Sequence, residues 1–153
     1  ELKLNQNETH GEIERKLSNL GASLLFESLK TIETGNPKFI NQDISKVTYA
    51  KKIDKKETKI NWNLKANKLL GHIHGLSPSP GAWFEYDSER FKVLRAIISS
   101  KNGKPGLVID ENLTIGCGSD SIQILELQRQ GKKNQTTKEF LLGSKINKGT
   151  ILI

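Results

Sequence analysis

The first apolar pattern along the chain has the period of a helix. Thr9 and Glu12 have the T-x-x-E spacing of a capping box, and Gly35 followed by Pro37 is typical of a helix end. Between these limits, apolar residues recur at three- and four-residue steps: Ile13, Leu17, Leu20, Leu24 and Ile32. The pattern predicts one helix of about 25 residues. No second helix is nearby, so we expect its apolar stripe to pack on a part of the protein outside this chain.

Residues 36–59 have little periodicity and the densest lysine run of the chain, which predicts an extended linker. The apolar patch INW follows. Asn63 then has the character of an N-cap, and the segment LKANKLLGHIHGL places its apolar residues roughly on one side, which predicts a second helix.

From Ala82 onward the pattern changes to short alternating segments separated by turn residues. They predict five strands, at residues 82–86, 90–99, 106–110, 113–117 and 121–128. In the second segment the alternation slips by one residue between Val93 and Leu94, which indicates a β-bulge that bends the strand. Five strands with one long, bent member predict a mainly β fold with helices, namely a five-stranded Greek-key barrel of the OB type.

Two further segments complete the predicted fold. The stretch GLSPSPGAW at residues 75–83 reads as a rigid corner between helix and first strand, because Pro78 and Pro80 restrict the backbone and Gly81 lets it turn. A last helix is predicted after the capping box of Thr136 and Glu139, and the tail TILI can add a short edge strand.

Composition narrows the class of protein. No stretch reaches the roughly 18 apolar residues of a membrane span, and the N-terminal ELKLNQNETH lacks the layout of a signal peptide, so we expect a cytoplasmic location. A single cysteine excludes an internal disulfide. The chain begins at Glu1 and contains no methionine, which we interpret as the sign of a piece of a larger protein.

The net charge of +7 is unevenly placed. Residues 1–45 hold five basic and seven acidic residues, so residues 46–153 hold the other 19 basic and 10 acidic ones, a balance of +9. Such an excess attracts phosphates and favours nucleic-acid binding. The alternative is compositional, because 20 of the 24 basic residues are lysine, as an AT-rich genome would encode at tolerant surface positions.

No pattern of catalytic residues emerges from the sequence. His72 and His74 fall in a helical pattern that separates their rings, and His10 sits at a helix start, so surface or packing roles are favoured over a metal site. Cys117 alternates with apolar residues and has no predicted base beside it. GCGSD at residues 116–120 is followed by a strand, so it reads as a hairpin turn instead of a phosphate loop. Three aromatic residues are candidates for stacking on bases but are more often core: Tyr49, Trp83 and Tyr86.

Several strings occur in a characteristic order: THGEIERKLSNLGASLLFESLKTIETG, QDISKVTYAKKI, INWN, IHGLSPSPGAW, PGLVID and LELQRQGKKNQTTKEFLLG. Together they resemble the C-terminal half of the methionyl-tRNA formyltransferase family, over essentially the whole chain. The resemblance implies that residues 1–40 are the last helix of a truncated Rossmann-like formyltransferase domain. Residues 41–59 would be a basic linker, and residues 60–153 an OB-like C-terminal domain.

The resemblance also implies a function. The family formylates the methionyl amine of initiator tRNA with 10-formyltetrahydrofolate as co-substrate, and its catalytic residues would lie upstream of Glu1. The chain is therefore expected to be inactive alone, with no catalytic, cofactor or metal residues, and to bind initiator methionyl-tRNA and its own N-terminal formyltransferase domain. The expected tRNA-binding residues are Lys51, Lys52, Lys55, Lys56, Lys59, Lys92, Arg95, Arg129, Lys132, Lys133, Lys145 and Lys148. The alternative is a support domain of another folate-dependent formyl enzyme, such as a sugar formyltransferase or a formyltetrahydrofolate dehydrogenase, that does not bind tRNA.

Overall fold

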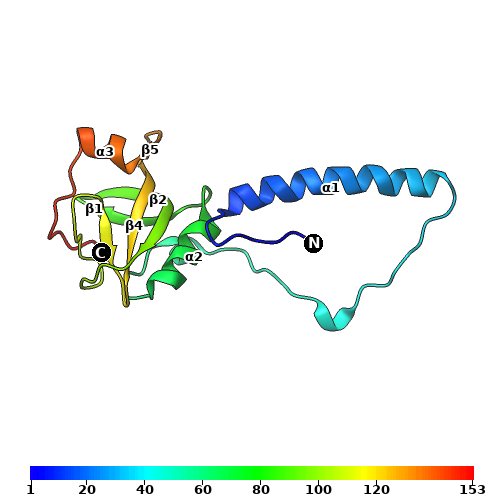
Figure 1. Ribbon diagram of the computed structural model, residues 1–153, viewed down its shortest axis with the longest axis horizontal. Helices are drawn as coiled ribbons and strands as arrows, with labels where there is room; N and C mark the ends of the chain where they lie inside the picture. The colour runs from blue at the N-terminus through cyan, green and yellow to red at the C-terminus, as the bar shows by residue number, and fades with distance from the viewer.

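A computed structural model describes residues 1–153, and its centre is a five-stranded antiparallel sheet. The strands are β1 (Ala82–Tyr86), β2 (Glu89–Ser99), β3 (Thr114–Gly116), β4 (Ser121–Arg129) and β5 (Asn134–Thr136). The order is β1-β2-β4-β3, and β5 also pairs with β4 (Figure 1). Four of the predicted strands are confirmed to within one residue at either end, because short apolar segments bounded by turn residues are a local signal.

The predicted closed Greek-key barrel is not confirmed, because β1 and β3 lie at opposite ends of the order and the sheet stays open. The predicted strand at 106–110 is absent. Leu107 and Val108 make only isolated bridges, to Ile151 and Ile115. Gly106, with a φ of +79°, curls the backbone there, and the N–H of Leu107 donates to the carbonyl of Lys104. A curled segment cannot hold the continuous ladder of a strand.

The predicted bulge in the long strand is confirmed. The pairing of β2 with β4 shifts register between Val93 and Arg95, and again between Arg95 and Ala96. Val93 and Leu94 are both buried, although neighbouring residues in a regular strand point to opposite faces.

α1 spans His10–Glu33, and its predicted capping box is present, with Thr9 and Glu12 bonded reciprocally. No residue of α1 is buried, and the apolar side chains of Leu17, Leu24 and Phe26 are at least half exposed. Figure 1 shows why: α1 touches the rest of the fold only near its N-terminal end and projects away from the sheet. Its apolar stripe therefore has no partner within residues 1–153.

The segment after α1 returns from the far end of the helix to the sheet (Figure 1). It contains two short 3₁₀ turns, η1 (Ile44–Lys46) and η2 (Lys55–Thr58). Most of this segment lies outside helices and strands, but its last turn, η2, is held against the sheet by contacts described below.

α2 spans Ala66–Leu76 and begins later than predicted. Asn63 does not cap it. Instead the N–H of Ala66 donates to the carbonyl of Ser119 at 3.0 Å, and the N–H of Gly118 donates to the carbonyl of Leu64 at 2.9 Å. The loop between β3 and β4 thus satisfies the start of α2 in place of a side-chain cap.

The core lies between α2 and the sheet, where Ile73 and Phe84 are completely buried. A row of aromatic rings continues through it: Trp62 lies 5.8 Å from Phe84, Phe84 5.4 Å from Phe91, and Phe91 5.8 Å from Phe140. Phe140 belongs to α3 (Thr137–Gly143), whose predicted capping box is also confirmed. No helix is both long and apolar enough to cross a membrane.

Candidate nucleic-acid interface

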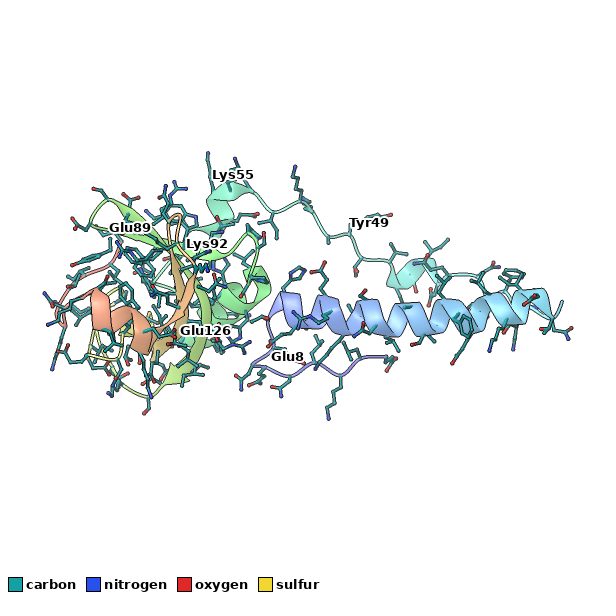
Figure 2. All side chains as sticks on the ribbon, turned by 90° about the horizontal axis from the view of Figure 1, so that it is seen from above. Glu8, Tyr49, Lys55, Glu89, Lys92 and Glu126 are labelled. Atoms are coloured by element: carbon teal, nitrogen blue, oxygen red, sulfur yellow. The ribbon has the colours of Figure 1, made fainter.

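A polar groove of about 1040 Å³ lies where η2, the corner before β1, the β1–β2 hairpin and the end of β4 meet. Six of its lining residues are cationic: Lys55, Lys56, Lys59, Arg90, Lys92 and Arg129. Glu85 is the only carboxylate in the lining. Figure 2 shows Lys55, Glu89 and Lys92 on the same side of the strands, away from Glu8 and Glu126. A groove with this charge balance concentrates anions.

The last turn of the linker is fixed into this groove. Asp54 and Glu57 form a capping box around η2. The indole N–H of Trp83 donates to the hydroxyl of buried Thr58 at 2.9 Å, and the main-chain N–H of Ile60 donates to the carbonyl of Trp83 at 2.7 Å. On the other side, Nε2 of His72 lies 2.6 Å from the carbonyl oxygen of Glu57. Three lysines that the sequence places in a linker, at positions 55, 56 and 59, are thereby attached to the sheet.

Arg90 belongs to this groove and was missed in the sequence interpretation. Its guanidinium carbon lies 4.1 Å from the centre of the Trp83 ring, and Nζ of Lys59 lies 5.7 Å from the same ring. The signal was available, since Arg90 and Lys92 alternate with buried Phe91 and so point to the same face of β2.

The corner GLSPSPGAW forms one wall of the groove through Pro80 and Gly81. Gly81 has a φ of +86°, and a Cβ there would lie only 2.8 Å from Cδ of Lys92. Glycine therefore serves two purposes at this position: it permits the turn, and it leaves room for the Lys92 stem to run across the wall.

Arg129 closes the opposite side of the groove and is paired. Its Nη2 lies 2.7 Å from Oε2 of Glu89, and its Nε donates to Oε1 of the same carboxylate at 3.0 Å. The hydrogen bond from Arg129 holds the pKa of Glu89 below its usual value, and Glu89 in turn raises the pKa of Arg129. The positive charge of Arg129 is thus partly offset by Glu89. None of the other five groove cations has a carboxylate within 4.0 Å.

The remaining predicted lysines lie outside the groove, all of them exposed. Lys51 and Lys52 precede η2, and Lys132 and Lys133 follow the groove residues Gln130 and Gly131 in the β4–β5 turn. Lys145 and Lys148 come after α3 and do not line the groove. The structure thus brings Lys55, Lys56, Lys59, Lys92 and Arg129 together and leaves six lysines at the margins or beyond.

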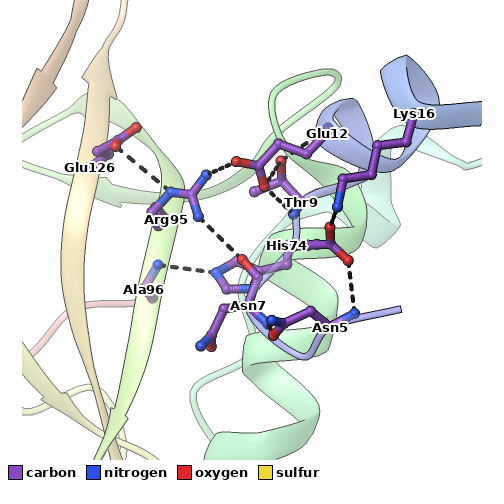
Figure 3. A network of polar contacts seen from close by, with 10 residues as sticks. Asn5, Asn7, Thr9, Glu12, Lys16, His74, Arg95, Ala96 and Glu126 are labelled. Carbon is purple, nitrogen blue, oxygen red and sulfur yellow. Dashed lines mark hydrogen bonds and ion pairs between the residues drawn. The ribbon is translucent and has the colours of Figure 1, made fainter. Parts of the chain in front are cut away.

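Arg95 is not in the groove, although it follows Lys92 on the same strand. Figure 3 shows that its guanidinium faces the start of α1, with Nη2 2.6 Å from Oε1 of Glu12 and Nη1 donating to the carbonyl of Asn7 at 3.2 Å. Glu126 lies 3.8 Å from Nε. Hydrogen bonds from Thr9 first, and then from Arg95, lower the pKa of Glu12 to about 2. The ion pair with Glu12 at the start of α1, beside the register shifts of the bulge, holds Arg95 in this direction.

Beside this network, Nε2 of buried His74 accepts a hydrogen bond from the N–H of Ala96 at 3.3 Å, and burial lowers its pKa (Figure 3). Cys117 is also buried, which raises the pKa of its thiol to about 11. A neutral imidazole that accepts a backbone hydrogen bond and a protonated thiol are both structural groups. No cluster of three histidine, cysteine, aspartate or glutamate residues with metal-binding geometry occurs.

The three candidate stacking aromatics differ in their surroundings. Tyr86 packs against Phe91 at 6.4 Å, as a core-edge residue does. Tyr49 is 92% exposed in the linker, and Trp83 is half-buried beneath its two cations. Within the groove, the chemistry available is therefore the binding of anionic groups by lysine and arginine.

The chain is similar to known proteins in both sequence and fold. The family model described as "Formyl transferase, C-terminal domain" matches residues 52–145. A protein from Pelagibacter ubique called methionyl-tRNA formyltransferase is 43% identical over 97% of this chain and 48% of its own length. One of the same name from Rhodopseudomonas palustris is 46% identical over 90% of this chain and 46% of its own length. The chain thus spans about half the length of these relatives.

Solved structures with a similar fold include HypX from Aquifex aeolicus. One crystal structure of HypX gives a TM-score of 0.69 at 18% identity, covering 97% of this chain and 30% of that one. Another, of HypX in complex with tetrahydrofolic acid, gives a TM-score of 0.62 at 18% identity, covering 82% and 26%. At this identity the likeness concerns the fold.

Proposed function

The chain belongs to the formyl transferase C-terminal domain family, and from this premise we propose that it is the tRNA-binding part of a methionyl-tRNA formyltransferase. The cationic groove is the observation that carries the proposal, because its lining contains six basic side chains and a single carboxylate. The names of the relatives that are 43% and 46% identical support the choice of tRNA as the ligand.

The whole enzyme would transfer the formyl group of 10-formyltetrahydrofolate to the methionyl amine of initiator tRNA. We place its catalytic site in the half that this chain does not cover, so the chain alone is inactive. Residues 1–40 would belong to that formyltransferase domain, residues 41–59 to the linker and residues 60–153 to the C-terminal domain. The exposed apolar stripe of α1 supports this division, because a packed sheet would cover it. An enzyme acting on initiator tRNA belongs in the cytoplasm.

The proposed interface centres on the groove cations without carboxylate partners: Lys55, Lys56, Lys59, Arg90 and Lys92. Arg129 contributes at the edge, and Lys51, Lys52, Lys132 and Lys133 extend the basic surface on two sides. Lys145 and Lys148 are peripheral. We exclude Arg95, because its guanidinium is engaged by Glu12 and Asn7.

Filter binding of the chain to initiator tRNA, across a salt series, tests the proposal. Five free cations correspond to a log–log slope of about −3.5 to −4.5, from counterion release of roughly 0.7 to 0.9 per contact. Charge reversal at Lys59 and Lys92 should weaken binding at least tenfold and flatten the slope by about 2. The control is Lys38→Glu, which makes the same change at an exposed position beyond α1.

The results of these binding measurements distinguish a tRNA-binding domain from a support domain. If the chain does not bind tRNA, or if binding is independent of salt, the tRNA proposal fails and a support domain of another folate-dependent formyl enzyme becomes the better assignment. If Lys38→Glu weakens binding as much as reversal at Lys59 and Lys92, the ligand binds elsewhere and the groove is the wrong site.

A further inference from the structure

The Trp83 ring occupies the point at which the linker joins the sheet. Its indole N–H is bound to the Thr58 hydroxyl at 2.9 Å, and its carbonyl accepts from the N–H of Ile60 at 2.7 Å. The Thr58 hydroxyl in turn donates to the carbonyl of Lys55 at 2.7 Å. Trp83 thus fixes η2 from both its side chain and its main chain, and the orientation of its ring is determined by these contacts.

The same ring lies against two cations. The Arg90 guanidinium carbon is 4.1 Å from the ring centre, close enough for the planar group to cover a ring face, and Lys59 Nζ is 5.7 Å away. Neither cation has a carboxylate within salt-bridge distance. Glu85, opposite Arg90 on β1, makes no ion pair with either cation, so the quadrupole of the indole is the contact that holds these two charges in the groove.

A nucleobase would have to displace Arg90 to stack on the ring face that it covers. A phosphate needs no such displacement, because the N–H groups of Arg90 and the ammonium of Lys59 keep their donors free toward the groove. Lys92, which alternates with Arg90 along β2, adds a third donor from the same face. Three like charges this near one another repel, and a polyanion relieves that repulsion.

We infer that Trp83 is a positioning residue that holds Arg90 and Lys59 toward the phosphodiester backbone of the nucleic acid, and that it does not stack on a base. This inference rests on the proposed function and deepens it, because it specifies that the groove recognises backbone phosphates regardless of base identity. Sequence readout, where the whole protein needs it, would come from elsewhere.

Two variants and one spectroscopic measurement test the inference. Trp83→Phe keeps an aromatic face for the cations and loses the indole N–H, whereas Trp83→Leu keeps bulk and loses the face. We expect Trp83→Phe to bind single-stranded oligonucleotides within about threefold of the parent chain, with the same salt slope. Trp83→Leu should bind about tenfold more weakly, with a slope shallower by about one contact. Tyr49→Leu, at an exposed aromatic outside the groove, is the control.

Fluorescence titration of the parent chain tests, without a mutation, whether a base stacks on Trp83. Trp62 is only 4% exposed and lies in the core, so strong quenching on binding reports base stacking on Trp83. We expect little quenching, and equal affinities for oligo(U) and oligo(A) of the same length. Quenching of the fluorescence by half or more would overturn the inference. A clear preference for one oligomer, combined with an equal loss of affinity in both Trp83 variants, would overturn it as well. These results would leave tRNA binding intact, whereas no binding by the parent chain would overturn the proposed function as well.

Discussion

Gly118→Ala should be strongly destabilising, although Gly118 is neither in a helix nor at a positive φ. The reason is its distance from the backbone of another segment. A Cβ at this position would overlap the carbonyl oxygen of Asn63 and lie 2.8 Å from its carbonyl carbon. These are main-chain atoms, which cannot rotate away as the end of a side chain can. The loop must therefore move away from residues 63–66.

The magnitude follows from what that movement breaks. The hydrogen bonds from Gly118 N–H to Leu64 and from Ala66 N–H to Ser119, 2.9 and 3.0 Å long, are each worth about 1 kcal/mol. Overpacking of a tight contact adds about 1–3 kcal/mol. We expect the free energy of unfolding to fall by about 3–5 kcal/mol, and the Tm by roughly 6–20 °C for a chain of this size.

Gly71→Ala is the matched control, because Gly71 lies in the middle of α2 and a Cβ there meets nothing within 4 Å. This change should raise the free energy of unfolding by about 1 kcal/mol, as alanine does in an exposed helix interior. Urea unfolding followed by tryptophan fluorescence measures both variants, since Trp62 is buried next to Asn63. If Gly118→Ala unfolds at the same urea concentration as the parent chain, the loop does not cap α2 in the way the structure indicates.

Three further predictions concern groups outside the groove. Arg95→Met removes the partner of Glu12, so amide hydrogen exchange at the start of α1 should accelerate and the free energy of unfolding should fall by about 1 kcal/mol. A loss of tRNA affinity instead would show that Arg95 belongs to the interface. Burial of Asp110 opposes ionisation, but hydrogen bonds from Lys101 and neighbouring groups lower its pKa to about 2. Since this is below the unfolded value, its contribution of about 1–2 kcal/mol, after allowance for solvent screening, is complete above about pH 5 and lost as pH falls toward 2. Asp110→Asn should flatten urea midpoints measured across that range, and an unchanged pH dependence would contradict the pKa. The buried Cys117 thiol, with its pKa raised to about 11, should react with a thiol reagent only as fast as the chain unfolds; rapid reaction in native buffer would contradict its burial.

The groove shows which features of the site can be predicted from residue patterns and which cannot. The alternation of Arg90, Phe91, Lys92 and Val93 is local, so the order of residues alone determines that both cations share a face. Their meeting with Lys59 depends on Trp83, whose contacts with the end of the linker span more than twenty residues of chain. Charge counting therefore identified most of the groove cations without showing which of the twelve predicted residues meet.

Arg95 shows the limit of the same reasoning. Its positive charge placed it among the candidates, but Glu12, 83 residues earlier in the chain, binds its guanidinium. The absent strand at 106–110 has a similar origin. Its apolar run, Leu107 to Ile109, has the composition of a strand. Gly106 curls the backbone, however, and separate hydrogen bonds join the segment to residues 149–152 on one side and 114–116 on the other.

The sequence by itself determined the capping boxes of α1 and α3, the four main strands, the bulge and the excess of positive charge, because each depends on residues within a few positions of one another. The tertiary structure decided where α2 begins, whether the sheet closes and which cations share the groove. Those outcomes depend on contacts between segments that are distant in the chain. Each contact contributes about 1 kcal/mol and forms only when the whole chain packs, so it produces no periodic pattern in the sequence.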